Sequence, residues 1–528
     1  MRTRFFGGKV YLGEGHFAES FVVEDDKFLL TEDDTGFDEE IDLKGRTVIP
    51  GLNDSHLHMN QMGQHLRRVN LNVARSIDDV LQLTREFISE HPPKNGFIYG
   101  RGWNQDYFTS GEERLLTKED LDTITTEYPL MLERVCGHIT TLNTKALEYV
   151  GITKDTVIDG GEIRLGEDGE PNGILTENAL NYAREFIPKE TEEEVKEQLM
   201  AAMDRALSMG ITSVGSADYY IATYEMLAPM LRDLYRHREH SLRYDPQFNF
   251  HQMDLLKDYY ERFYTEEGAY DDYYSKGTLK LFKDGSLGGR TALMREVYHD
   301  DPSTSGVAAL TRAEVIEFLQ FCEDHDMRMI VHCIGDGAVE ELIQVYTEVA
   351  AEGNPNRHGI VHCQITDEDQ LQRIAQANIT VYYQPVFLEY DILITEERVG
   401  KKLASTSYAF KTMQELAPHL VSYGTDAPVE DFNPFENIYH AVTRQRKDGT
   451  PEEGFYPEEK VSVERAIDAY TMGSAYATGH EDVKGRIESG YFADFVILDK
   501  DIFSCDPFEI KGIMPLATYV GGKKVYEI

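Results

Sequence analysis

Eight short apolar runs recur along this chain, and longer stretches of helical character separate them. Alternation of this kind is what a closed barrel of eight parallel strands and eight helices, a (β/α)8 barrel, requires. The runs are TVIPGLND (47–54), GITSVGSAD (210–218), LRYDPQFNF (242–250), TLKLFKDG (278–285), RMIVHCIGD (328–336), HGIVHCQIT (358–366), ITVYYQPV (379–386) and LVSYGTDAPV (420–429). The sequence therefore predicts an α/β protein built on a (β/α)8 TIM barrel.

The spacing of the runs is uneven, because far more residues separate the first two than one strand and one helix need. We expect an inserted lobe at about 65–205, after the first barrel strand. Both chain ends contain short β-rich pieces with glycine turns, such as KVYLG and LATYVGGKKVYEI. We therefore expect a small β-sandwich domain from residues 1–50 and 483–528, and the barrel with its insertion over 51–482.

Composition and charge narrow the classes of partner. The 528 residues include 94 Asp and Glu against 52 Lys and Arg, which gives a net charge of -42. Such a charge repels nucleic acid and anionic membranes, so we expect a small-molecule substrate instead. No stretch approaches the roughly 20 apolar residues of a membrane span. The N-terminus does not resemble a signal peptide and the five cysteines are scattered, so a cytoplasmic location is expected. The sequence is also compatible with a homodimer.

Polar side chains gather where the predicted barrel strands end. The active site of such a barrel lies at the carboxyl ends of its strands. Neutral imidazoles and a carboxylate at that place are good ligands for zinc, which keeps an open position for water in catalytic sites. A single histidine is more often a hydrogen-bonded structural residue, and the joint occurrence is what favours a metal. The residues concerned are His56, His58, Lys280, His332, His362 and Asp426.

Lys280 needs its own explanation, because an ammonium group cannot bind a cation. Alternation along the strand places Lys280 and Asp284 on one face, and Lys283 on the other. If the first face lines the barrel, Lys280 points inward and Lys283 points toward the helices. A buried lysine with a lowered pKa can react with carbon dioxide, and the resulting carbamate is an anionic ligand able to bridge two metals. A salt-bridged barrel lysine is the alternative.

The chain resembles the amidohydrolase superfamily and, within it, the YtcJ-like metal-dependent hydrolases of amidohydrolase family 3. The resemblance covers nearly the whole chain. The motifs that carry it are IDLKGRTVIPGLNDSHLH, GRGWNQD, VCGHITTLNTKAL, GILTENA, LKLFKDGSLGGRTA, HCIGDGA, RHGIVHCQ, YGTDAPV and GRIESGYFADFVILD. The resemblance implies a barrel with a β-sandwich from both termini, and metal ligands from strands one, four, five, six and eight.

Carried over position by position, the resemblance implies a role for each of the six residues. His56 and His58 correspond to the strand-one ligands, and Lys280 to the carboxylated bridging lysine. The ligands of strands five, six and eight correspond to His332, His362 and Asp426. The chain departs from the family at Val361, where an acidic residue is common, and at Lys283, where a small or apolar residue is common.

The mechanism that we expect uses one or two divalent ions, most simply zinc, to activate a water and polarise a substrate carbonyl. Asp426 would accept the proton of that water and pass it to the leaving group. The expected reaction is cleavage of a C–N bond in an N-acyl, N-formyl or cyclic amide. Hydrolysis of esters or carbamates at the same site is an alternative, and so is a non-catalytic binding protein that has kept the fold.

Three residues are candidates for contact with the substrate, and each has two interpretations. Trp103, the only tryptophan, lies in GRGWNQD and would either wall the pocket or belong to the core of the inserted lobe. His138 in VCGHIT would bind substrate or have an ordinary structural role. Arg290 in DGSLGGRTA would hold a carboxylate or carbonyl oxygen of the substrate, or form a salt bridge within this acidic protein.

Overall fold

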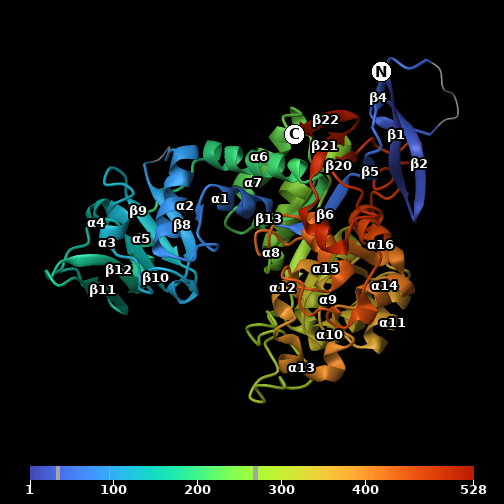
Figure 1. The fold of residues 1–528 in the computed structure, drawn as a ribbon. Coiled ribbons are helices and arrows are strands. Elements are labelled where there is room, and N and C mark those ends of the chain that lie inside the picture. Colours follow the sequence, from blue (N-terminus) through green and yellow to red (C-terminus); the bar gives the residue numbers. More distant parts are fainter. Residues whose placement is uncertain (31–35, 94–95, 266–270) are drawn as a thin grey trace. The chain divides into compact units, whose positions relative to one another are not determined.

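The computed structural model describes residues 1–30, 36–93, 96–265 and 271–528. The chain divides into two compact units (Figure 1). The first combines Met1–Met59 with Ala202–Ile528, and the second is Asn60–Ala201. The first unit contains the barrel and a sheet made from both chain ends, and the second is a separate lobe inserted after the first barrel strand.

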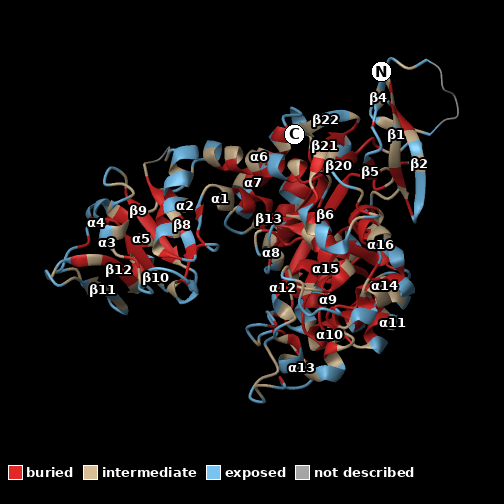
Figure 2. Ribbon diagram, in the orientation of Figure 1, coloured by how far each residue is buried: buried red, intermediate tan, exposed pale blue. Residues whose placement is uncertain are grey.

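Eight parallel strands form the barrel sheet, in the spatial order β19-β18-β17-β16-β15-β14-β13-β6. All eight arise from the eight apolar runs of the sequence. Their residues are almost all buried, as expected for parallel strands that are covered on both faces (Figure 2). The strands are β6 (Leu52–Leu57), β13 (Ile211–Tyr220), β14 (Arg243–Asn249), β15 (Thr278–Phe282), β16 (Arg328–Cys333), β17 (Gly359–His362), β18 (Thr380–Tyr383) and β19 (Val421–Tyr423).

The first and last strands meet, which nearly closes the sheet. The backbone N–H of Asp426 donates to the carbonyl of His56 at 2.9 Å, and Ser55 Oγ donates to the carbonyl of Tyr423 at 2.9 Å. Asp54 adds a side-chain link, because its carboxylate accepts from Thr425 Oγ1 at 2.7 Å and from the backbone N–H of Thr425. The predicted barrel is therefore confirmed, and the same contacts bring residues 54–58 beside residues 425–427.

Helices follow the strands and begin at residues that cap them. Thr311 and Asp367 each form a capping box, which satisfies N–H groups that a helix start leaves unpaired. Asn433 likewise accepts from the first turn of the helix after β19. The main helices are α7 (Tyr224–Arg236), α9 (Arg312–Asp324), α10 (Asp336–Val349), α11 (Glu368–Gln376), α13 (Thr395–Ala404), α14 (Phe410–Leu416), α15 (Pro434–Thr443) and α16 (Val463–Asp468).

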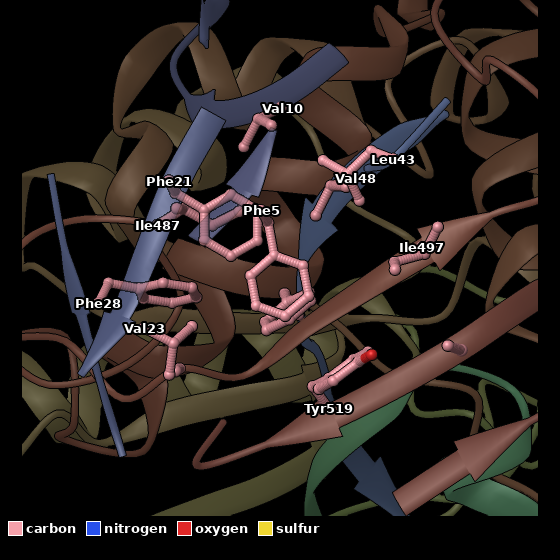
Figure 3. Packing of buried hydrophobic residues seen from close by; sticks show 13 residues of the cluster. Phe5, Val10, Phe21, Val23, Phe28, Leu43, Val48, Ile487, Ile497 and Tyr519 are labelled. Atoms are coloured by element: carbon pink, nitrogen blue, oxygen red, sulfur yellow. The ribbon is translucent and has the colours of Figure 1, made fainter. Parts of the chain in front are cut away.

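The two chain ends build one sheet beside the barrel. Its order is β22-β21-β20-β5-β1-β2-β3, with β4 paired to β1. Phe5, Phe21, Phe495 and Tyr519 pack their rings together in its core, and Figure 3 shows this cluster. The strands are β1 (Arg2–Gly13), β2 (His16–Glu24), β3 (Lys27–Leu29), β4 (Glu39–Asp42), β5 (Thr47–Pro50), β20 (Phe495–Leu498), β21 (Pro515–Val520) and β22 (Lys523–Glu527).

Gly51 separates the terminal sheet from the barrel. Strand β5 pairs with β1 and β20, whereas β6, which starts at Leu52, pairs with β13. A Cβ atom on Gly51 would lie 2.2 Å from Thr212 Oγ1, closer than non-bonded atoms can approach. The run TVIPGLND thus contributes to two sheets, and the chain passes from one to the other where only glycine fits.

The inserted unit has its own sheet and core. Its strand order is β11-β12-β10-β9-β8-β7, and its apolar side chains form two clusters, one around Trp103 and Leu132 and one around Leu142 and Leu175. Its main elements are β7 (Val69–Asn70), α2 (Ile77–Glu90), β8 (Ile98–Trp103), β9 (Leu130–Arg134), β10 (Ile139–Leu142), α4 (Thr144–Val150), β11 (Gly161–Leu165), β12 (Pro171–Glu177) and α5 (Asn178–Arg184).

Among the described residues, no helix is both long and apolar enough to span a membrane.

Candidate metal centre

Three of the predicted ligands converge where β6 meets the loop after β19. Nε2 of His56 lies 3.4 Å from Asp426 Oδ1, and Nε2 of His58 lies 3.1 Å from the same oxygen. All three side chains are buried, and one ligand atom from each lies within 4.8 Å of the others. Ligands about 2 Å from a zinc ion are roughly 3 to 3.5 Å apart, so this spacing suits a shared metal.

The other three predicted ligands come from consecutive strands of the same barrel. The rings of His332 and His362, at the ends of β16 and β17, are 4.4 Å apart between centroids, and the ring of His362 is 6.0 Å from that of His56. Lys280 of β15 is buried beside them. The structure thus brings all six residues together at the carboxyl end of the barrel.

Buried ligand atoms without partners show that these residues fit a metal. Nε2 of His56, Nδ1 of His332 and Nζ of Lys280 are inaccessible to solvent and have no hydrogen-bond partner among the described residues. A buried polar atom left without a partner costs about 1–3 kcal/mol. A divalent cation satisfies the two imidazole nitrogens, and carboxylation of Lys280 would turn its nitrogen into part of an anionic ligand.

Burial keeps His56 and His332 in the form that binds metals, whereas at His58 the contact with Asp426 outweighs burial and raises the pKa. Burial, followed by the positive charge of Lys280, holds the pKa of His56 well below its usual range, and burial lowers the pKa of His332 to about 4. These imidazoles are therefore neutral at physiological pH and have a free lone pair. Burial also lowers the pKa of Lys280 to about 8, which increases the fraction of neutral, nucleophilic amine.

The backbone is strained at two of the ligands. His362 has φ 75° and Asp426 has φ 58°, in the left-handed region that residues with a Cβ atom rarely occupy. Such conformations cost of order 1–3 kcal/mol and gather at functional sites, because the surrounding structure must hold them in place. Here the strain turns two side chains into the mouth of the barrel.

Comparison with known proteins assigns the family. The family model described as "Amidohydrolase family" matches residues 39–526. The chain is 32% identical to the putative amidohydrolase YtcJ of Bacillus subtilis, over the full length of both proteins. The chain belongs to the amidohydrolase family.

Two further proteins resemble this amidohydrolase, and one of them is described as a metal-dependent hydrolase. The crystal structure of an uncharacterized metal-dependent hydrolase from Pyrococcus horikoshii matches it with a TM-score of 0.75 and 27% identity, covering 96% of this chain and 99% of that one. The N-substituted formamide deformylase of Arthrobacter pascens is 26% identical, over 93% of this chain and 90% of that protein. The family and these relatives support a hydrolase activity that depends on a divalent metal.

Two glutamines orient the ligand histidines of the amidohydrolase, and sequence reasoning missed both. Nδ1–H of His56 donates to Oε1 of Gln247 at 2.6 Å, and Nδ1–H of His362 donates to Oε1 of Gln384 at 2.7 Å. Each glutamine is itself held by its Nε2, which donates to a backbone carbonyl. These bonds leave Nε2 of both histidines for the metal. The available signal was a glutamine within or directly after an apolar strand, in the stretches PQF and YYQ.

The remaining two histidines are oriented by backbone carbonyls, and His58 also by the hydroxyl of Tyr220, which lies 3.0 Å from its Nδ1. Nδ1–H of His58 donates to the carbonyl of Ala217 at 3.0 Å, which leaves Nε2 facing Asp426. Nε2–H of His332 donates to the carbonyl of Gly285 at 3.1 Å, so Nδ1 is its free nitrogen. His332 therefore presents the opposite ring nitrogen from the other three, a distinction that sequence cannot make.

The side chains of the two residues that depart from the family pattern have partners other than the ligands. Lys283 is buried and forms an ion pair with Glu341 of α10 at 2.5 Å, so it points toward the helices as the alternation predicts. Val361 is fully buried in an apolar cluster with Ile330 and Tyr382. His362 obtains its hydrogen bond from Gln384 instead, so the valine does not leave it without an orienting partner.

The three residues that were expected to contact the substrate make other contacts in the structure. Trp103 is fully buried in the core of the inserted unit, where Nε1 donates to the carbonyl of Leu132, so its ring offers no surface to a ligand. His138 is exposed on that unit and lies 3.0 Å from Glu177 Oε2. Arg290, in the loop after β15, forms an ion pair with Asp300 at 2.7 Å. Of the two roles considered for Arg290, the salt bridge is the one observed.

Proposed function

We propose that this amidohydrolase cleaves the C–N bond of a small amide, with one or two divalent ions, zinc in the first place, held by His56, His58, Lys280, His332, His362 and Asp426. The substrate is an N-acyl, N-formyl or cyclic amide, and the protein works in the cytoplasm without nucleic acid or membrane. The protein partner that we propose to test is a second copy of the chain, in a homodimer. The observation that carries the proposal is the convergence of buried ligand atoms that lack partners.

A divalent ion bound here supplies Lewis acidity toward the substrate carbonyl and lowers the pKa of a bound water. The protein supplies the proton transfers. Burial by itself would raise the pKa of Asp426, but its contact with His58 and with the other histidines around it outweighs burial and lowers the pKa. The Asp426 carboxylate is therefore ionised at neutral pH and accepts the proton of the attacking water, which it then donates to the leaving nitrogen.

The number of ions held would depend on the chemical state of Lys280. Its neutral amine would attack carbon dioxide at carbon and lose one N–H proton to solvent, which gives a carbamate whose single negative charge is shared by two oxygens. Support comes from the burial of Nζ, from its lack of a hydrogen-bond partner among the described residues, and from a pKa of about 8. A carbamate on Lys280 would supply anionic oxygen ligands beside the histidines.

N-formyl amides are the first class to test, because the relative from Arthrobacter pascens is named an N-substituted formamide deformylase. The experiment removes metal with a chelator, reloads zinc or another divalent ion, and follows amine release from a panel of N-formyl, N-acetyl and cyclic amides beside esters and carbamates. We expect amide turnover that disappears with the metal and returns with it.

Asp426→Asn tests the catalytic assignment. The variant should keep a folded barrel and lose hydrolysis by about 10²–10⁴-fold, the usual contribution of an acid-base group. Asp501→Asn, which alters a carboxylate beside the terminal sheet and paired to Lys9, is the control and should retain full activity. Turnover of esters or carbamates alone would favour the alternative substrate class. A metal-loaded protein that binds amides and esters without hydrolysing any would be a binding protein.

A further inference from the structure

Three aromatic side chains surround the candidate metal centre. We propose that Tyr220, Phe282 and Phe387, called here the aromatic collar, bind a planar aromatic group of the substrate next to the scissile bond. The inference rests on the proposed function, because it concerns the same site. It adds a preference for an aromatic group on the substrate, which neither the metal ligands nor the comparisons indicate.

Two collar residues stack on ligand histidines. Tyr220, the last residue of β13, lies with its ring 6.3 Å from that of His58 and inclined by 20°. Phe387 belongs to the short helix η4 (Pro385–Phe387) after β18, and its ring lies 5.6 Å from that of His362 at 17°. Near-parallel rings at these distances are in the range of aromatic stacking. Both rings are therefore fixed directly against the ligands.

The third ring completes the collar from a strand between the other two. Phe282 ends β15, and its ring centroid is 5.1 Å from that of His332 and 4.0 Å from Lys280 Nζ. The three residues come from β13, β15 and the segment after β18, which are different parts of the barrel circumference. All three lie at or after the carboxyl ends of barrel strands, where the active site of such a barrel is found. They border the centre on several sides.

The collar is more exposed than most of the ligands. Tyr220, Phe282 and Phe387 are each partly exposed, as is His332, whereas His56, His58 and Lys280 are buried. Each ring therefore offers some aromatic surface to solvent next to a candidate ligand.

Exposed apolar side chains lie close to the collar in sequence. Ile221 directly follows Tyr220 and is 50% exposed, Tyr390 and Leu393 follow Phe387 and are each 60% exposed, and Val429 follows Asp426 and is 63% exposed. The segments that carry the collar and Asp426 thus leave apolar side chains available to a ligand, on a chain of net charge -42.

Ring geometry distinguishes an aromatic group from any other apolar group. Aromatic pairs gain free energy beyond the area that they bury, and this gain corresponds to about a two- to tenfold difference in binding. An aliphatic group of similar volume buries comparable area without it. The collar therefore predicts a preference for phenyl over cyclohexyl groups at the same position.

The experiment compares matched amides that carry an N-(2-phenylethyl) or an N-(2-cyclohexylethyl) group, within each acyl class that the zinc-loaded enzyme accepts. The two leaving amines have similar reactivity, so the ratio of their kcat/KM values reports recognition. We expect a ratio of about two to ten in favour of the phenyl compound. Phe387→Leu should bring the ratio toward one, and Phe387→Tyr should retain it.

Controls separate the loss of the ring from damage to the metal site. Phe17→Leu removes a 40% exposed ring in the terminal sheet and should leave the ratio unchanged. Metal content of each variant is measured, since Phe387 packs on His362 and the hydroxyl of Tyr220 contacts Nδ1 of His58. Tyr220→Leu should act as Phe387→Leu does, and Tyr220→Phe should keep the preference because it retains the ring.

A binding measurement keeps the inference independent of turnover. The zinc-loaded protein is titrated with 2-phenylethylamine and with 2-cyclohexylethylamine, and the same two- to tenfold preference, lost in Phe387→Leu, is expected. Equal binding of the two amines, or a ratio that Phe387→Leu leaves unchanged, would overturn the collar. If no amide is hydrolysed but the binding preference is present, the proposed function fails while the collar stands.

Discussion

Oε1 of Gln247 lies 2.6 Å from Nδ1 of His56, and Nε2 of the same amide donates to the carbonyl of Ser55. The second bond fixes which end of the amide faces the imidazole. Gln247 must accept there, so His56 carries its proton on Nδ1 and directs the lone pair of Nε2 toward Asp426. A neutral amide on β14 thereby sets the ligand atom of a histidine on β6.

Gln247→Leu should weaken metal binding by about 10- to 100-fold, as is usual when the partner that orients a ligand is removed. The loss follows because His56 is then free to rotate or to adopt the other tautomer. Competition with a chromogenic chelator measures the affinity of the variant. Gln247→Glu keeps an oxygen acceptor and should stay closer to the native value. Equal affinity of the native and leucine proteins would contradict the role given to this glutamine.

Lys280→Met should lower the number of tightly bound ions from two to one if the lysine bridges them, because methionine cannot form a carbamate. Elemental analysis gives the metal stoichiometry, and native mass spectrometry of the wild type in bicarbonate should show one added carbon dioxide. The added mass should diminish as the pH falls below about 8, where the amine becomes protonated. An unchanged stoichiometry in the variant would show that the lysine holds no metal.

Asp494→Ala should destabilise the barrel and its terminal sheet by about 3–5 kcal/mol, since it leaves the buried guanidinium of Arg243 without its partner. The two side chains form paired contacts of 2.6 and 3.0 Å, and both are almost fully buried. Thermal and urea unfolding measure the loss. Glu527→Ala, which removes an exposed ion pair with Lys524, is the control and should change stability by at most about 1 kcal/mol. Similar effects of the two substitutions would show that the buried pair contributes no more than the exposed one.

Asp468→Asn should change how stability depends on pH. Burial raises the pKa of Asp468 in the folded protein to about 6, above the value of 3.8 expected for an exposed carboxyl. The folded state therefore binds the proton more tightly, so this group's contribution to stability is largest below about pH 4 and is lost as the pH rises to about 6. The asparagine, which can still accept from Tyr11, does not titrate.

The thermal midpoints of the wild type and the Asp468→Asn variant, measured from pH 4 to pH 8, check this expectation. The difference, variant minus wild type, should increase from pH 4 to pH 6 and then stay constant. A difference that is independent of pH would mean that Asp468 has an ordinary pKa in the folded protein.

Much of the fold could be predicted, because parallel barrel strands are buried on both faces and must be apolar runs. The run RMIVHCIGD became β16 for this reason, with His332 near its end. The alternation of side chains along β15 likewise placed Lys280 inside and Lys283 against α10. The break at Gly51 is different, since it depends on the proximity of Thr212, which is distant in sequence.

The burial of Trp103 shows what a local sequence pattern cannot predict. Its motif resembles the family, but a motif does not say whether a ring faces a pocket or a core. The hydrogen bond from its indole to Leu132 and its complete burial exist only because β8 and β9 pair. Arg290 is similar, because its partner Asp300 had no signal beyond the acidity of the chain.

By itself the sequence determined the barrel, the family and the six residues at its strand ends, because hydrophobic periodicity and residue type are local properties of the chain. Only the tertiary structure decided which atoms of those residues meet. The choice of Nε2 for His56 and His362 and of Nδ1 for His332 depends on hydrogen bonds that these histidines donate to Gln247, to Gln384 and to the carbonyl of Gly285. Those partners are on other strands or loops, and a hydrogen bond exists only where folding brings donor and acceptor to within about 3 Å.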